Sequence, residues 1–204
     1  LYGKVLLSNV PHAKIKSIDT SAAEALPGVR AVATYLNTPQ VRYNSAVRFI
    51  ENQLPNTERI FDDTVRFVGD RVAAVAADTI DIAKKAVNLI KVEYEPLPVI
   101  TEVEEAIKPE AYPIHEGGNI VSTARAEAGN VEEAFKECDY VFEDRYTTQS
   151  IHHAAIEPHI AIGDYNANGK LTVYSPCQNT FAFRVILSRI FDLPYNKIRM
   201  VSPA

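Results

Sequence analysis

The chain has 204 residues, of which 47% are hydrophobic and 23% are charged, and its formal net charge at pH 7 is −5. This composition is typical of a globular protein with one large or two small domains, and it offers no basic surface for nucleic acid. No apolar run approaches the roughly 20 residues that a membrane-spanning helix needs. The two cysteines, Cys138 and Cys177, are too few for a disulfide framework, which favours a cytoplasmic location.

Short periodic segments separated by turn residues fill the first part of the chain. Residues 4–8, 15–19 and 29–34 predict strands, and residues 21–26 predict a short helix with a Ser21/Glu24 capping box. Residues 35–60 contain several Asn and Pro residues without periodicity, which predicts an irregular excursion. In a compact domain such a stretch is more often functional, or docked against a partner, than idle.

Residues 65–100 carry the clearest pattern. They predict a strand, a turn at Gly69-Asp70, a second strand of small apolar residues at 71–77, a helix, and an alternating strand at 91–95. Asp78 is placed to cap the helix, whose apolar residues recur at spacings of three and four. The pattern therefore predicts a compact β-β-α-β module.

A link rich in Pro and Gly is predicted at residues 109–129. After it we expect a helix at 131–138 capped by Asn130, a strand at 140–148, a hairpin of residues 159–165 and 170–174 over a turn at 166–169, a helix at 181–191 and a strand at 197–201. The fold class is α+β in two parts, residues 1–115 and residues 130–204.

The segment VGDRVAAVAADT, with the following helix and VEYEPLPVI, resembles the hammerhead domain of the xanthine dehydrogenase/aldehyde oxidase family of molybdenum hydroxylases. The opening segment LYGKVLLSNVPHAKIKSIDT is similar to the first strands of that domain. The segments GNVEEAFKECDYVFEDRY and LTVYSPCQNTFAFRVILSRI resemble the start of the molybdopterin-binding domain. The resemblance thus covers nearly the whole chain. It implies a hammerhead-like mixed-sheet domain at 1–115 and a truncated N-terminal part of the molybdopterin-binding domain at 130–204.

The resemblance implies that the parent protein is the large subunit of a xanthine dehydrogenase-like hydroxylase that binds the molybdenum cofactor. Such enzymes oxidise an N-heterocycle such as a purine, or an aldehyde, and pass electrons to 2Fe-2S clusters and FAD on partner subunits or domains. The chain opens on Leu1 within a strand-like run, and its one methionine is Met200, so we expect an internal fragment. The family's pterin loop and catalytic glutamate are expected beyond Ala204. We therefore expect the isolated fragment to be inactive, with no bound cofactor, no metal ligand and no catalytic residue.

The loop at residues 175–180 is the main candidate site. It joins a predicted strand end to a helix start, where free N–H groups and the helix dipole favour anions. Gln178 offers a neutral amide that can donate to an oxo group without adding charge. From the residues alone, Asn179 or Thr180 could instead cap the helix while Gln178 points to water. The resemblance implies that Gln178 is the cofactor-binding glutamine that hydrogen-bonds an oxo ligand of the molybdenum.

Two departures from the family leave the substrate open. Many relatives have Thr where this chain has Cys177, and some purine oxidisers have Lys where it has Ala182. Cys177 near a helix start also suggests a thiol enzyme, although no orienting third group can be assigned. A further alternative is that residues 1–115 only assemble subunits and do no chemistry.

The histidines at 152, 153 and 159 are not predicted to form a metal site. Pro158 argues against one continuous helix that would bring His153 and Glu157 together. In an extended chain His153 and His159 lie about 20 Å apart, which is too far to share one ion.

Overall fold

The computed structural model describes residues 1–46 and 55–203. Its elements, in chain order, are β1 (Tyr2–Leu7), β2 (Ala13–Asp19), α1 (Ser21–Glu24), β3 (Val29–Thr34), β4 (Thr64–Val65), β5 (Arg71–Ala77), α2 (Ile80–Val87), β6 (Lys91–Pro96), α3 (Val103–Ala106), α4 (Val131–Lys136), β7 (Ile162–Tyr165), β8 (Leu171–Tyr174), α5 (Thr180–Phe191), the 3-10 helix η1 (Tyr195–Lys197) and β9 (Ile198–Val201). The strands of the described residues form three sheets, ordered β1-β5-β3, β4-β2-β6 and β7-β8-β9. The structure confirms the α+β class.

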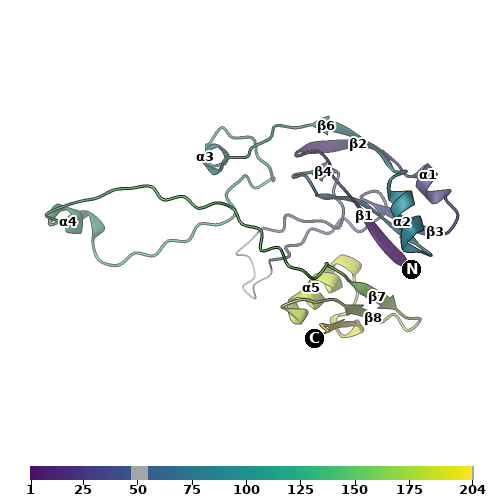
Figure 1. The fold of residues 1–204 in the computed structure, drawn as a ribbon. Helices are drawn as coiled ribbons and strands as arrows, with labels where there is room; N and C mark the ends of the chain where they lie inside the picture. Colours follow the sequence, from purple (N-terminus) through teal and green to yellow (C-terminus); the bar gives the residue numbers. More distant parts are fainter. Residues whose placement is uncertain (47–54, 204) are drawn as a thin grey trace.

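Two groups of elements are separated in space. Figure 1 shows β1 to β6 with α1 and α2 on one side, and β7, β8 and α5 in a second group. We call residues 1–119 the N-terminal unit and residues 160–203 the C-terminal unit. None of the helices in the described residues has the length and apolar character needed to cross a membrane.

Strand β5 forms the centre of the N-terminal unit. Its small side chains permit close packing, and Val72, Ala73 and Val75 are at most 1% exposed. Strands β1 and β3 pair with it on either side in antiparallel fashion, and α2 packs against β5 and β1. The predicted strand at 71–77 is confirmed, and its position as the middle strand explains why it consists of Val and Ala.

The prediction that Asp78 caps α2 is wrong. The cap is Thr79, whose hydroxyl oxygen accepts a hydrogen bond from the N–H of Ile82 at 3.2 Å. The carboxylate of Asp78 is instead held by the guanidinium of Arg30 on β3, at 2.9 and 2.8 Å. Arg30 keeps the pKa of Asp78 below its ordinary value. The Asp78 carboxylate is thus engaged by Arg30, and the capping residue of α2 is Thr79, one position later.

The predicted Ser21/Glu24 capping box is also absent. Helix α1 begins after Thr20, whose side chain makes no capping hydrogen bond to the backbone. The Ser21 N–H donates to a carboxylate oxygen of Asp19 at 3.0 Å, and the Glu24 carboxylate accepts from the Thr20 hydroxyl at 2.7 Å. Ser21 and Glu24 are therefore bonded to the side chains of Asp19 and Thr20 and not to each other's backbone.

The second sheet of the N-terminal unit follows the predicted alternation. On β6, Val92 and Tyr94 are half-buried and the other four residues are exposed. The irregular stretch predicted at residues 35–60 has one isolated β-bridge in its described part, between Tyr43 and Glu58. The rest of that prediction, at residues 47–54, lies outside the described residues.

The link between the two units begins later than the predicted residues 109–129. The ring of Tyr112 packs edge-on against His12 at 5.7 Å between ring centroids. The carbonyl oxygen of Ile114 accepts from Arg66 Nε at 3.2 Å, and Glu116 pairs with Arg42 at 3.1 Å. Residues up to about 119 therefore belong to the N-terminal unit.

Residues 120–159, which we call the excursion, extend away from both units, with α4 at their tip (Figure 1). Helix α4 is capped as predicted, because Asn130 accepts from the N–H of Glu133 at 3.3 Å. The predicted strand at 140–148 is wrong, since these residues have no strand partner among the described residues. Every residue from 121 to 160 is exposed. An alternating sequence makes a strand only when another strand supplies hydrogen bonds.

The C-terminal unit matches the predicted hairpin, helix and last strand. Strands β7 and β8 pair antiparallel over a turn in which Gly169 has a φ of +71°, a value that suits glycine. Strand β9 then pairs with β8 in parallel, with α5 as the connection between them. Ala182, Ile186 and Ile190 of α5 are buried together with Ile198 of β9.

Candidate functional site

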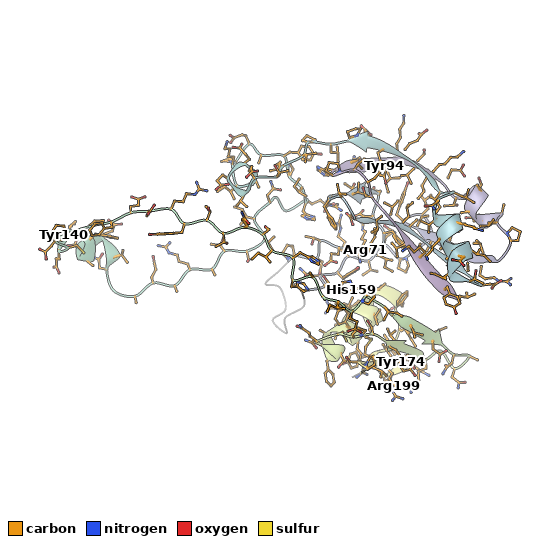
Figure 2. All side chains as sticks on the ribbon, in the orientation of Figure 1. Arg71, Tyr94, Tyr140, His159, Tyr174 and Arg199 are labelled. Atoms are coloured by element: carbon orange, nitrogen blue, oxygen red, sulfur yellow. The ribbon has the colours of Figure 1, made fainter. Side chains whose placement is uncertain are left out.

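The loop of residues 175–179 lies at the carboxyl end of two parallel strands. Strands β8 and β9 run in register from Leu171↔Ile198 to Tyr174↔Val201, so both end at the same edge of the sheet. In open, mostly parallel α/β sheets, ligands bind in the crevice outside the carboxyl ends of the strands; here β8 and β9 form the one parallel pair described in a mixed sheet, since β7 is antiparallel to β8. Figure 2 shows Tyr174 and Arg199 within this C-terminal unit, far from Tyr140 on the excursion.

Three hydrogen bonds hold the first part of the loop. The Ser175 N–H donates to the carbonyl oxygen of Val201 at 3.0 Å, and the Ser175 hydroxyl donates to that of Ile160 at 3.0 Å. The Cys177 N–H donates to the hydroxyl oxygen of Ser202 at 3.5 Å. The loop is thus attached both to the end of β9 and to the segment that enters β7.

The helix start holds the other end of the loop. Asn179 caps α5, because its side-chain oxygen accepts from the N–H of Ala182 at 3.0 Å. Gln178 lies between this cap and the bonded Cys177. Its side chain is exposed and makes no hydrogen bond within the described part of the chain. The structure therefore leaves the amide of Gln178 available, while Asn179 takes the capping role.

Cys177 has no catalytic partner among the residues that the structure describes. The thiol is free and half-buried. Across residues 1–46 and 55–203, no hydrogen bond joins its sulfur to a histidine or to any other base. A thiol enzyme needs such a base within hydrogen-bond reach, so the geometry does not favour the nucleophile interpretation.

The histidines on the excursion are arranged as a stack. The rings of His152 and His153 are nearly parallel, with 5.3 Å between centroids, and His152 Nδ1 accepts from the N–H of Ala154 at 2.9 Å. No group of three or more His, Cys, Asp or Glu side chains in the described residues is placed to hold a metal ion.

A charged cluster in the N-terminal unit was missed by the sequence analysis. The carboxylate of Asp62 lies between Arg59 and Arg66, each at 3.0 Å. Burial raises the pKa of Asp62, but a hydrogen bond from Asp63 and the two guanidinium groups outweigh it and lower the pKa below its ordinary value. Arg66 also binds the carbonyl oxygen of Ile114. The cluster therefore anchors the end of the N-terminal unit.

His115 lies beside this cluster. Burial lowers its pKa below 6.5, and the nearby charges of Arg66 and Arg42 lower it further. Its Nδ1 atom is buried and has no hydrogen-bond partner in the part of the chain that the structure describes. A neutral imidazole suits this position, because a second positive charge would be unfavourable next to two arginines.

The hydroxyl groups of Ser175 and Ser202 were also missed. Each serine directly follows a strand of the parallel pair and directly precedes a proline. Two Ser-Pro dipeptides after two predicted strands were visible in the sequence. Their meaning depends on the strands being parallel neighbours, which no local pattern shows.

Comparison with protein families covers nearly the whole chain. Residues 1–98 match the family described as aldehyde oxidase and xanthine dehydrogenase, a/b hammerhead domain. Residues 114–204 match the molybdopterin cofactor-binding domain. The gap between the two matches contains α3 and Tyr112, while Ile114 and Glu116, which also contact the N-terminal unit, lie at the start of the second match.

Individual proteins that resemble this chain are also named as molybdopterin or xanthine dehydrogenase subunits. The chain is 41% identical to a probable xanthine dehydrogenase subunit of Bacillus subtilis over 99% of its length, and covers 26% of that protein. It is 37% identical to the nicotinate dehydrogenase large molybdopterin subunit of Eubacterium barkeri, covering 98% of this chain and 46% of the relative. The chain therefore spans less than half the length of these curated relatives.

A solved structure agrees with the sequence relatives. The aldehyde oxidoreductase from Desulfovibrio gigas superposes with a TM-score of 0.86 at 26% identity, over 98% of this chain and 23% of that one. The fold of both units, and not only their sequence, is thus shared with a protein of this kind. These matches show that the chain belongs to the xanthine dehydrogenase/aldehyde oxidase family, with a hammerhead domain followed by molybdopterin-binding sequence.

Proposed function

We propose that this chain is part of the molybdenum-binding subunit of a hydroxylase, and that the amide of Gln178 donates a hydrogen bond to a ligand of the molybdenum centre. One observation carries the proposal. Gln178, whose exposed side chain makes no hydrogen bond to any described residue, stands at the carboxyl ends of β8 and β9, between the bonded Cys177 and the capping Asn179. A donor in that position adjoins the carboxyl ends of a parallel strand pair, and in parallel α/β sheets this is the edge that binds ligands.

The residues of the loop fit an oxygen-rich, negatively charged group. Residues 175–180 contain no acidic side chain that would repel it. The N-terminus of α5, a helix of 12 residues, adds a partial positive charge at the same place. When bound, the molybdenum cofactor supplies the redox chemistry of hydroxylation, while the protein contributes position and hydrogen bonds. Gln178 would orient the centre without changing its net charge.

The proposed substrate is a small molecule with an electron-poor carbon, of the N-heterocycle or aldehyde class. Relatives named for such substrates include a nicotinate dehydrogenase, a probable xanthine dehydrogenase subunit and an aldehyde oxidoreductase, whereas another relative is named a carbon monoxide dehydrogenase. The choice within this class is proposed to depend on residues near Gln178, with Cys177 and Ala182 as the candidates.

The proposed partners are FAD-binding and 2Fe-2S-binding subunits or domains in the cytoplasm. Several relatives are named as subunits, which supports assembly with other chains. The excursion exposes large apolar side chains, with Tyr140 81%, Phe142 92% and Tyr146 87% exposed. Apolar surface of this extent marks contact surfaces, so an assembly role of the chain is a second candidate function.

The test is a Gln178→Ala variant of the complete molybdenum enzyme, with Gln149→Ala as the control. Gln149 is also exposed, but it lies on the excursion. We expect Gln178→Ala to lower turnover about tenfold, the lower end of the range for residues that act outside the metal's own ligands. Molybdenum content should stay near wild type in both variants. Wild-type turnover at full molybdenum occupancy in Gln178→Ala would show that Gln178 is only a loop residue beside a helix cap.

A further inference from the structure

We propose that Ser175 and Ser202 form a clamp that positions the loop carrying Gln178. The inference rests on the proposed function of Gln178 and adds the residues that hold its donor in place. Both serines occupy the same position in the fold, one residue beyond the carboxyl end of a parallel strand.

Ser175 ties the end of β8 in two directions. Its N–H donates to the carbonyl oxygen of Val201 at 3.0 Å, which extends the β8–β9 pairing by one bond beyond the strand. Its hydroxyl donates to the carbonyl oxygen of Ile160 at 3.0 Å, which reaches the chain just before β7. A single residue therefore connects the loop to both neighbours of β8.

Ser202 completes the clamp from the end of β9. Its hydroxyl oxygen accepts from the Cys177 N–H at 3.5 Å, a long hydrogen bond and so the weaker of the contacts. Pro176, between the two bonded residues, has no N–H. The amides on both sides of Pro176, at Ser175 and Cys177, are thus both engaged by the clamp.

The prolines limit the alternatives. Pro176 and Pro203 each fix their own φ near −65°, and each restricts the preceding serine to an extended backbone. Gln178 follows Cys177, whose N–H is bonded to Ser202, and precedes Asn179, which caps α5. The backbone around Gln178 is therefore held on both sides, so rotation of its own side chain is the main freedom left. A donor held in this way is preorganised, and preorganisation determines how well it acts on a bound group.

Hydrogen exchange in the chain tests the clamp directly. We expect Ser175→Ala to raise amide exchange in residues 175–179 about fivefold, the effect of losing one ordinary hydrogen bond, and Ser202→Ala, which removes the longer bond, to raise it by a smaller factor. Ser175→Thr, which keeps the hydroxyl, should restore the wild-type rate. Ser188→Ala is the matched control, because the Ser188 hydroxyl binds the carbonyl oxygen of Leu193 at 2.6 Å at the opposite end of α5. It should leave the loop unchanged.

Turnover of the complete enzyme separates this inference from the proposed function. We expect Ser175→Ala to lower kcat by less than the about tenfold loss in Gln178→Ala, with recovery in Ser175→Thr and an altered electron paramagnetic resonance signal of the molybdenum. Wild-type exchange in the loop of both alanine variants would overturn the clamp and leave the role of Gln178 standing. Faster exchange together with wild-type turnover in Gln178→Ala would instead refute the proposed function and leave the clamp as a structural feature.

Discussion

Ile198 holds α5 against the sheet of the C-terminal unit, and we expect Ile198→Ala to destabilise that unit and leave the N-terminal unit unchanged. Its side chain is 2% exposed. The change removes three methyl or methylene groups, which is about 2.4 kcal/mol at roughly 0.8 kcal/mol for each group. The cavity that remains brings the total loss to about 3–4 kcal/mol.

The C-terminal unit has little else to absorb such a loss. In the described residues it buries four hydrophobic side chains, Ala182, Ile186, Ile190 and Ile198, whereas the N-terminal unit buries fourteen. Stabilities of whole domains are only about 5–15 kcal/mol. A unit with so small a core is at the low end of that range, so a loss of this size removes most of its stability.

Hydrogen exchange by mass spectrometry distinguishes the two units. Peptides from residues 171–201 should lose protection in Ile198→Ala, while peptides from residues 71–96 should keep it. Val75→Ala is the matched control, since Val75 is 1% exposed at the centre of the other core and its truncation costs about 2 kcal/mol. It should weaken protection in residues 71–96 instead. Unchanged protection of residues 171–201 in Ile198→Ala would refute the view that α5–β9 packing supports this unit.

Two further predictions concern the N-terminal unit. We propose that it folds by itself, so limited proteolysis should cut first within residues 121–160, all of which are exposed, and leave a stable fragment ending near residue 119. First cuts within residues 65–100 would contradict this division. Burial and the adjacent arginines lower the pKa of His115 below 6.5, so the unfolded chain takes up this proton first as pH falls. The contribution of neutral His115 to stability is therefore complete above about pH 6.5 and is lost as pH falls through the lowered folded-state pKa. His115→Gln should flatten the fall in urea midpoint between about pH 7 and 5, and an identical fall in both proteins would rule this mechanism out.

Local pattern was sufficient where the physics is local. Side-chain periodicity indicates which side of an element is buried. It does so for the run of Val and Ala at 71–77, the alternation at 91–95 and the helical spacing at 181–191. The hairpin turn near Gly169 and the cap at Asn130 depend on residues no more than four positions apart. These features were predicted from the sequence, because side-chain periodicity and turn chemistry act over the same short range.

Pattern failed where a distant partner decides the outcome. Asp78 has the chemistry of a helix cap, yet Arg30, 48 positions earlier, takes its carboxylate and leaves the cap to Thr79. Residues 140–148 alternate as a strand does, but a strand requires hydrogen bonds from a second segment, and none of the described residues supplies them.

The candidate site also has features that local sequence predicts and features that only the tertiary structure decides. The sequence by itself determined that a polar loop with Gln178 joins a strand to a helix start, because both elements are readable from their own residues. Only the tertiary structure decided that β8 and β9 lie parallel, that their ends meet, and that Ser175 and Ser202 therefore reach the same loop. Ser175 and Ser202 are 27 positions apart in the chain, and the free energy that brings them together comes from the burial of α5 on β9 rather than from either local segment.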